Sequence, residues 1–175
     1  LRMKLRDISK KRFLIARLAE DKEFSISLIK EYGGIPIYIE PLRVMPIESE
    51  VIKLEEIIKY NLEKYKWIVF TSKTGLRIFY NLIKKYNLEI KNLKFASVGI
   101  STAEEARKIG INISFIPTKY TTKSLAEELP VLNGESILLI RSADAGNEMK
   151  EILTKRGANV YEVRPYKLEM NEGVK

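Results

Sequence analysis

Short apolar runs alternate with longer amphipathic stretches along the chain, and each kind of segment predicts one kind of element. An apolar run bounded by turn residues predicts a buried strand, and apolar residues spaced three or four positions apart predict a helix. The predicted strands are residues 13–16, 35–39, 67–70, 95–98, 111–116, 136–140 and 160–163, and Pro165 is expected to end the last of them. The predicted helices are residues 24–32, 51–65, 75–86, 102–109, 122–129 and 146–156. This alternation predicts an α/β fold with a parallel sheet that carries helices on both faces.

One segment, Pro41-Leu-Arg-Val-Met-Pro46, does not follow this alternation. Prolines at both ends stiffen such a segment and keep it from joining the elements on either side. The segment is therefore the first candidate for a linker between two parts of the chain.

Composition narrows the possible chemistry. With 45% hydrophobic residues in 175, the chain can build a real core, and no apolar run approaches the length of a bilayer span. The sequence shows no signal peptide and no cysteine, so a cytoplasmic protein without disulfides is expected. Histidine is also absent, which excludes a Ser-His-Asp triad and a His or Cys metal site. Acid–base work would fall to tyrosine, lysine or carboxylates.

The net charge of +8 is concentrated at the amino end. Residues 1–12 hold six basic residues against Asp7 alone, which leaves a modest excess of +3 for residues 13–175. This basic arm is interpreted as a solvated leader, and the alternative is contact with nucleic acid or a membrane surface.

The junction after the strand at residues 67–70 is the first candidate site. Thr71 and Ser72 stand where this strand ends, and a helical pattern follows from Lys73. Ligands of open α/β sheets bind beyond the carboxyl ends of the strands, and the free N–H groups of a helix start favour anions. These three residues are therefore expected to hold an anionic ligand.

A second junction carries Gly99, Ser101 and Thr102. Gly99 allows a sharp turn or a close approach to a ligand, and Ser101 with Glu104 forms a capping-box pattern. The alternative is that Ser101 only caps its own helix.

A third junction is rich in hydroxyl groups, which suit a polyanionic ligand. Its candidate residues are Tyr120, Thr121, Thr122 and Ser124. The alternative is a surface loop in which Thr122 is the helix N-cap.

Two arginines and a tyrosine complete the set of candidates. Arg141 ends a strand, where its guanidinium suits a carboxylate ligand, unless it pairs with Asp144 or Glu148. Arg17 ends the first strand in the same way. Tyr166 follows the last strand, and its phenol can donate a proton or a hydrogen bond.

The order of these junctions along the chain and their residues resemble those of the uroporphyrinogen-III synthase family. The matching segments are Leu14–Arg17, Phe70–Ser72, Val98–Ala103, Pro117 with Tyr120–Ala126, Leu138–Gly146, and Gly157–Val160 with Tyr166. Each segment is a weak signal, and six in the right order over most of the chain make a fairly specific match.

The resemblance implies two α/β domains with a cleft between them. It places residues 1–41 and 167–175 in the first domain, a linker at residues 42–47 and the second domain at residues 48–166. The implied activity is that of a lyase of heme biosynthesis, which closes hydroxymethylbilane with inversion of its last ring and loss of water.

The implied substrate is a polycarboxylate tetrapyrrole, and no metal or organic cofactor is implied. Tyr166 would help the hydroxyl leave as water. A monomer is expected, with no nucleic-acid or membrane partner.

The chain departs from the family in two respects. Ser142 stands where the family has glycine, and the chain stops where family members continue for several dozen residues. Residues 1–40 hold too few elements to close a stable domain, so either the chain is truncated or a second copy completes it. Two other functions stay open, a non-catalytic tetrapyrrole- or anion-binding module of the same fold and a nucleic-acid-associated protein that uses its basic arm.

Overall fold

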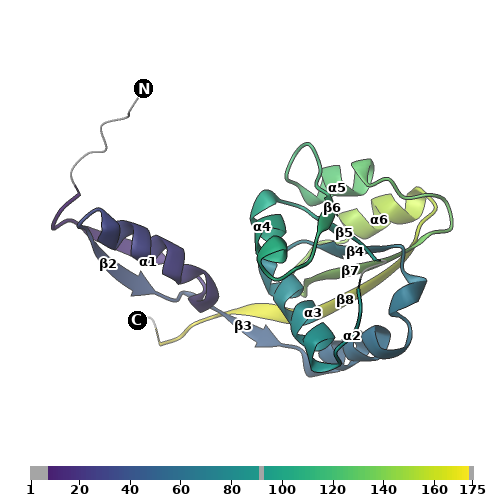
Figure 1. Ribbon diagram of the computed structural model, residues 1–175, viewed down its shortest axis with the longest axis horizontal. Helices are drawn as coiled ribbons and strands as arrows, with labels where there is room; N and C mark the ends of the chain where they lie inside the picture. The colour runs from purple at the N-terminus through teal and green to yellow at the C-terminus, as the bar shows by residue number, and fades with distance from the viewer. Residues whose placement is uncertain (1–7, 91–92, 174–175) are drawn as a thin grey trace. The chain divides into compact units, whose positions relative to one another are not determined.

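The structure is a computed structural model that describes residues 8–90 and 93–173, and it divides into two compact units (Figure 1). The first unit is Leu1–Met45 with Leu168–Lys175, and the second is Pro46–Lys167. Residues 1–7, which hold half of the basic side chains of the predicted arm, lie outside the described residues. No helix in the described ranges is long and apolar enough to cross a bilayer.

The first unit is small. Its elements are β1 (Arg12–Ala16), η1 (Ala19–Asp21), α1 (Lys22–Glu31) and β2 (Ile35–Ile39). The two strands are parallel, with Leu14 opposite Ile37, and α1 packs on one face of this two-stranded sheet. Gly33 lets the chain turn from α1 into β2, because its φ of 78° lies in the left-handed region that side chains rarely adopt.

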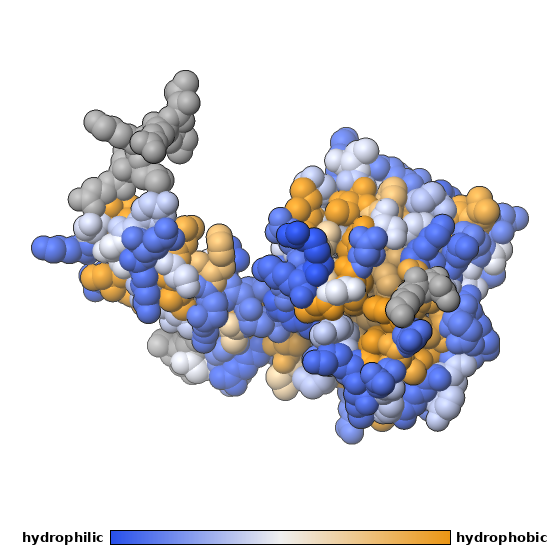
Figure 2. All heavy atoms as spheres, in the orientation of Figure 1, coloured by the Kyte–Doolittle hydropathy of each residue, from blue (hydrophilic) through white to orange (hydrophobic). Residues whose placement is uncertain are grey.

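The other face of this small sheet is apolar and exposed. Leu14 is 66% exposed, and Ile35 and Ile37 lie on the same face with 48% and 40% exposure. Figure 2 also shows hydrophobic residues among the hydrophilic ones at the surface of this unit. Among the described residues of the first unit, Ile15 is the one large apolar side chain that is buried. Burial of apolar area is the main stabilising term in folding, so this unit has little to hold it together.

We expect the first unit to open far more often than the second. Amides of β1 and β2 should exchange with deuterium at least about 100-fold faster than those of the sheet centre in the second unit, because few buried contacts oppose local opening. Hydrogen exchange read by mass spectrometry checks this. Equal protection of the two units would contradict it.

The second unit is a six-stranded sheet with helices on both faces. Its elements are α2 (Glu48–Tyr60), η2 (Leu62–Lys64), β4 (Trp67–Phe70), α3 (Lys73–Lys85), β5 (Lys94–Ser97), α4 (Ile100–Lys108), β6 (Ile113–Phe115), α5 (Thr122–Glu128), β7 (Ser136–Ser142), α6 (Glu148–Lys155) and most of β8 (Asn159–Met170). The sixth strand, β3 (Leu42–Pro46), belongs to the first unit up to Met45, as does the end of β8 from Leu168. The strand order is β3-β8-β7-β4-β5-β6, and the strands from β8 to β6 are parallel to their neighbours. The predicted α/β class is confirmed.

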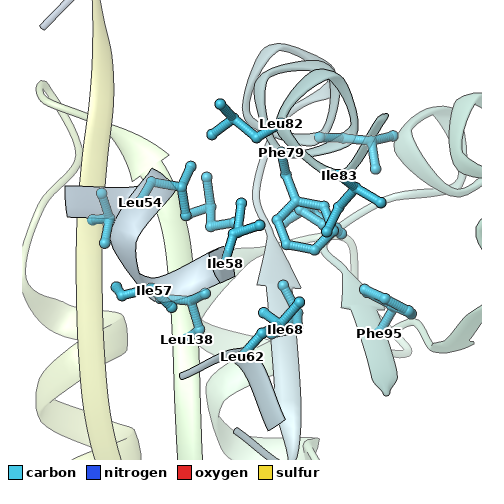
Figure 3. Close-up of a cluster of buried hydrophobic side chains, with 14 of the residues drawn as sticks. Leu54, Ile57, Ile58, Leu62, Ile68, Phe79, Leu82, Ile83, Phe95 and Leu138 are labelled. Atoms are coloured by element: carbon cyan, nitrogen blue, oxygen red, sulfur yellow. The ribbon is translucent and has the colours of Figure 1, made fainter. Parts of the chain in front are cut away.

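Two apolar layers hold the helices against the sheet. On one face α2, α3 and α4 pack on Ile68, Phe95 and Leu138, and Figure 3 shows the α2 and α3 side chains directed at these strand residues. On the other face α5 and α6 pack on Trp67, Val69 and their neighbours. The central strands β4 and β7 are buried on both faces, which explains why they are continuous apolar runs in the sequence.

Two predictions about the chain's prolines need correction. The stretch predicted as a linker contains the boundary between the two units, but its backbone forms β3, which lies beside β8 in the sheet. Pro165 does not end the last strand, since β8 continues through it to Met170. Pro165 is tolerated because it stands at a register shift between β7 and β8, where the regular ladder is interrupted.

Candidate functional site

The candidate site lies at the carboxyl edge of the second unit's sheet. From β4 the chain steps outward to β5 and β6, and it then returns to the other side of β4 to form β7 and β8. The order therefore reverses between β4 and β7. In open α/β sheets, ligands bind beyond the strand ends at such a reversal.

Two hydroxyl groups meet at this reversal point. The Oγ of Ser72, just after β4, lies 2.7 Å from the phenolic oxygen of Tyr166 on β8, and either can donate the hydrogen bond. Tyr166 is only 4% exposed, whereas Ser72 is half-buried. The two residues are 94 positions apart in the chain, so the sequence predicted each hydroxyl but not their contact.

Ser72 is also the N-cap of α3, since its Oγ accepts a hydrogen bond of 3.0 Å from the Gly75 N–H. Thr71 before it and Lys73 after it are both half-buried at the same helix start. The Ser72 hydroxyl therefore accepts a hydrogen bond from a backbone N–H on one side and is hydrogen-bonded to the Tyr166 phenol on the other.

Gly75 allows α3 to approach β7. A side-chain carbon at this position would lie 3.3 Å from the carbonyl oxygen of Ile140, from its Cγ2 and from the Ser72 Oγ. Sequence reasoning missed this role, although a glycine in the first turn of a predicted helix after a buried strand is a visible signal for such close packing.

The second junction is built differently from its prediction. Helix α4 begins at Ile100 with Gly99 as its N-cap, so Ser101 lies inside the first turn and the predicted Ser101 cap is wrong. The helix starts earlier because Gly99 already has the extended conformation that an N-cap requires. Ser101 is exposed and Thr102 is buried.

The third junction lies beside the second. The nearest atom to a side-chain carbon placed on Gly99 would be the Cβ of Tyr120, at 4.0 Å, and Tyr120 is 58% exposed. The N-cap of α5 is Thr121 and not Thr122, because the Thr121 Oγ1 accepts the Ser124 N–H at 3.1 Å. Thr122 is half-buried as the first helical residue, and Ser124 is buried.

A carboxylate holds the start of this junction. Glu128 accepts two hydrogen bonds of 2.8 Å from Thr118, one from its N–H and one from its hydroxyl. Both bonds lower the pKa of Glu128 below its usual range, and the bond from the Thr118 N–H has the larger effect. The Thr118 hydroxyl is therefore bound within the loop, whereas that of Thr121 is used for helix capping.

Arg141 does not join the exposed edge. It is 4% exposed, and its Nη1 donates to the Gly146 carbonyl at 2.8 Å and to Glu162 at 3.1 Å. The predicted alternative partners, Asp144 and Glu148, are wrong, because the side chain points to the α6 face where β8 presents Glu162. A substrate-binding role of Arg141 stays a prediction that this geometry does not favour.

Arg17 belongs to the first unit and is not brought together with the other candidates within one unit. It follows β1, as predicted, and its carbonyl accepts a hydrogen bond of 3.1 Å from the Tyr38 hydroxyl. Its guanidinium is exposed.

A charge network beneath the candidate site escaped sequence reasoning. Glu162 binds two arginines, Arg141 at 3.1 Å and Arg164 at 2.8 Å, and its side chain is 8% exposed. The main-chain N–H of Arg164 donates to the Glu50 carboxylate on α2 at 3.1 Å. The pKa of Glu50 is lowered most by the hydrogen bond that it accepts from the Lys53 side chain, and next by the one from the Arg164 N–H.

This pKa shift predicts acid sensitivity. Because the folded state lowers the pKa of Glu50, its contribution to stability is present above the pKa of an unfolded glutamate, about 4.3, and is lost as pH falls through the lower folded value. The free energy of unfolding of wild type should therefore fall more steeply below about pH 4 than that of Glu50→Gln. Urea unfolding across pH 2.5–7 (roughly the window of these pKa values) measures this, with the exposed Glu48→Gln as control. Parallel pH profiles of wild type and Glu50→Gln would contradict the prediction.

A cavity of about 450 Å³ lies against α6. Its walls are Asn147, Lys150, Glu151, Thr154, Lys155 and Glu162. It contains none of the predicted site residues, and its lysines and glutamates mix both signs of charge. Among the described residues, no group of three or more carboxylates could hold a metal ion.

The second unit is thus a parallel α/β unit whose carboxyl edge gathers hydroxyl groups and helix starts. The family model "Uroporphyrinogen-III synthase HemD" matches residues 24–175. The chain belongs to the uroporphyrinogen-III synthase family, as its resemblance predicted.

Similar proteins support this assignment and show how much of a relative's length the chain covers. The chain is 26% identical over 147 residues to the porphyrin biosynthesis protein HemD of Ruminiclostridium josui, covering 81% of this chain and 29% of that protein. It is 31% identical over 124 residues to a putative uroporphyrinogen-III synthase of Methanocaldococcus jannaschii, covering 70% and 48%. The crystal structure of a mutant uroporphyrinogen III synthase from Thermus thermophilus has the same fold, with a TM-score of 0.60, 18% identity, and coverage of 92% of this chain and 64% of that one. The chain therefore spans less than two thirds of these relatives.

Proposed function

We propose that this chain carries the chemistry of a uroporphyrinogen-III synthase, which closes hydroxymethylbilane to uroporphyrinogen III with inversion of ring D and loss of water. Its family supports a role in tetrapyrrole biosynthesis. The observation that carries the finer proposal is the contact between the Ser72 and Tyr166 hydroxyls at the reversal point of the sheet.

The proposed first step is loss of the terminal hydroxyl of the substrate. Tyr166 donates its phenolic proton to this hydroxyl, the C–O bond breaks, water leaves, and the pyrrole electrons form an azafulvenium cation, whose charge balances that of the phenolate. Ser72 can stabilise the resulting phenolate, because its Oγ accepts from the Gly75 N–H and keeps its own proton to donate to Tyr166. The step uses a phenolic proton and no further reagent.

The substrate's carboxylates are proposed to bind at the exposed parts of the same edge. The start of α3 at Thr71 to Lys73 offers N–H groups and a cation, and the pair Gly99 and Tyr120 offers an open surface beside an exposed aromatic ring. Holding a flexible linear tetrapyrrole in a curled shape would provide much of the remaining catalysis.

A coupled assay tests the reaction. Hydroxymethylbilane generated in situ should give isomer III in the presence of the protein, whereas the spontaneous reaction gives isomer I. Isomer I alone would reject the enzyme. Binding of a tetrapyrrole without turnover would instead support the non-catalytic module of the same fold.

Substitution of Ser72 separates capping from chemistry. Ser72→Ala should cost about 1 kcal/mol of unfolding free energy through loss of the α3 cap. Thr121→Ala, which removes the matched cap of α5, should cost a similar amount. Ser72→Ala should slow isomer III formation more than Thr121→Ala does, because only Ser72 contacts Tyr166, so equal rates for the two variants would contradict the role of Ser72.

A further inference from the structure

Strand β8 contains one more residue than its neighbour β7 at the level of the candidate site. Val163 pairs with Ile140 and Tyr166 pairs with Ser142, so Arg164 and Pro165 together stand opposite Arg141. Two residues against one define a β-bulge, a feature that redirects the side chains that follow it.

The bulge decides which face Tyr166 points to. Val163 faces the layer of α2 and α3, and in a regular strand a residue three positions later would face the opposite side. The extra residue returns Tyr166 to the face of α3, where its phenol lies 2.7 Å from the Ser72 Oγ. Without the bulge, Tyr166 would point to the face of α6.

The two residues of the bulge leave no main-chain N–H without a partner. The Arg164 N–H donates to Glu50 at 3.1 Å, Pro165 has no N–H to satisfy, and the Pro165 carbonyl accepts the Ile47 N–H at 2.9 Å. The proline that interrupts the sequence pattern thus stands where a missing N–H costs nothing.

The side chain of Arg164 ties the bulge to the loop after β7. Its Nη1 donates to the carbonyls of Ala143 and Ala145 at 2.9 and 2.7 Å, and its Nη2 donates to the Asn147 side chain at 3.0 Å. The Ala143 N–H in turn donates to the Tyr166 carbonyl at 2.8 Å. One guanidinium therefore fixes the loop segment that holds the backbone of Tyr166.

Glu162 orients this guanidinium. One of its oxygens accepts from the Arg164 Nε and the other from Arg141, which itself donates to the Gly146 carbonyl. The fork of an arginine can make these bonds at once, and a lysine ammonium cannot reproduce them.

We propose that Arg164 is a positioning residue, which locks the bulge in β8 and so aims the Tyr166 phenol at Ser72. The effect of Arg164 on the position of Tyr166 does not depend on the proposed function, whereas its effect on catalysis rests on that function.

The test is the ¹³C NMR signal of the Tyr166 phenol carbon in protein labelled at tyrosine Cζ. Loss of one signal in Tyr166→Phe assigns it among the nine tyrosines. Ser72→Ala gives the shift that follows when the phenol loses this partner. Arg164→Met should move the Tyr166 signal in the same direction, and Arg164→Lys should move it part of the way.

Arg156→Met is the matched control, because Arg156 also binds two main-chain carbonyls, but these belong to Ala126 and Leu129, which lie outside the bulge and the loop after β7. It should leave the Tyr166 signal in place. An unchanged signal in both Arg164 variants would overturn the proposal, and if Arg164→Met fails to fold, Arg164→Lys alone decides in the same way.

Turnover separates this inference from the proposed function. If the protein makes isomer III, Arg164→Met should lower kcat about tenfold with little change in KM, since a misplaced catalytic group slows chemistry more than binding. A protein without turnover would reject the proposed function while the NMR result still decides the role of Arg164.

Discussion

Replacing Tyr166 by phenylalanine is expected to lower the rate of isomer III formation about 100-fold while leaving KM nearly unchanged. General acid catalysis by a positioned side chain contributes about 10²- to 10⁴-fold, and the lower end applies here because the substrate also loses water without an enzyme. The phenol is buried against Ser72, so its removal deletes a proton donor without opening a large space. Steady-state kinetics with hydroxymethylbilane measures both constants.

Tyr161→Phe is the control for this change. Tyr161 lies on the same strand, but it is 46% exposed and packs beside Tyr65, with ring centroids 6.4 Å apart. It should keep wild-type kinetics. A normal rate in Tyr166→Phe would remove Tyr166 from the mechanism, and a raised KM with normal kcat would make it a binding residue instead.

Replacing Phe70 by alanine is expected to destabilise the second unit by about 3–5 kcal/mol, the usual cost of deleting a buried aromatic ring. Phe70 is fully buried at the end of β4, and its ring centroid lies 5.4 Å from that of Phe79 and 6.1 Å from that of Phe95. This loss is a large part of the total stability of a typical domain, so much of the variant should be unfolded at moderate temperature.

Urea unfolding followed by the fluorescence of Trp67 measures the change in Phe70→Ala, since Trp67 is the chain's one tryptophan and lies in the same strand. Tyr60→Ala is the control, because Tyr60 is 70% exposed and should cost less than about 0.5 kcal/mol. A cost below about 1 kcal/mol for Phe70→Ala would show that the aromatic cluster is not the centre of this core.

The sequence predicted the central strands best, because their burial on both faces makes them unbroken apolar runs. The run Trp67–Phe70 matches β4, and its two hydroxyl residues lie at the carboxyl edge as expected. The helix caps were predicted less well. Ser101 and Thr121 show why, since a cap depends on which residue first leaves the extended conformation, and a shift of one or two positions changes the capping residue.

Long-range features could not be predicted from local patterns. The contact of Ser72 with Tyr166 depends on the pairing of β8 with β7, and the partner of Arg141 depends on which β8 residue faces α6. Pro165 misled the prediction for the same reason, since a bulge is defined by the partner strand and not by the strand itself.

We propose that the carboxyl edge around Ser72 and Tyr166 is the functional face of this unit. The most direct measurement is amide NMR of the ¹⁵N-labelled chain titrated with uroporphyrin, a stable macrocycle with the eight carboxylates of the product. The largest shifts are expected on residues 71–74, 99–102 and 142–145 and on Tyr166. Shifts confined to the α6 cavity around Lys150 and Thr154, with the carboxyl edge unchanged, would contradict it.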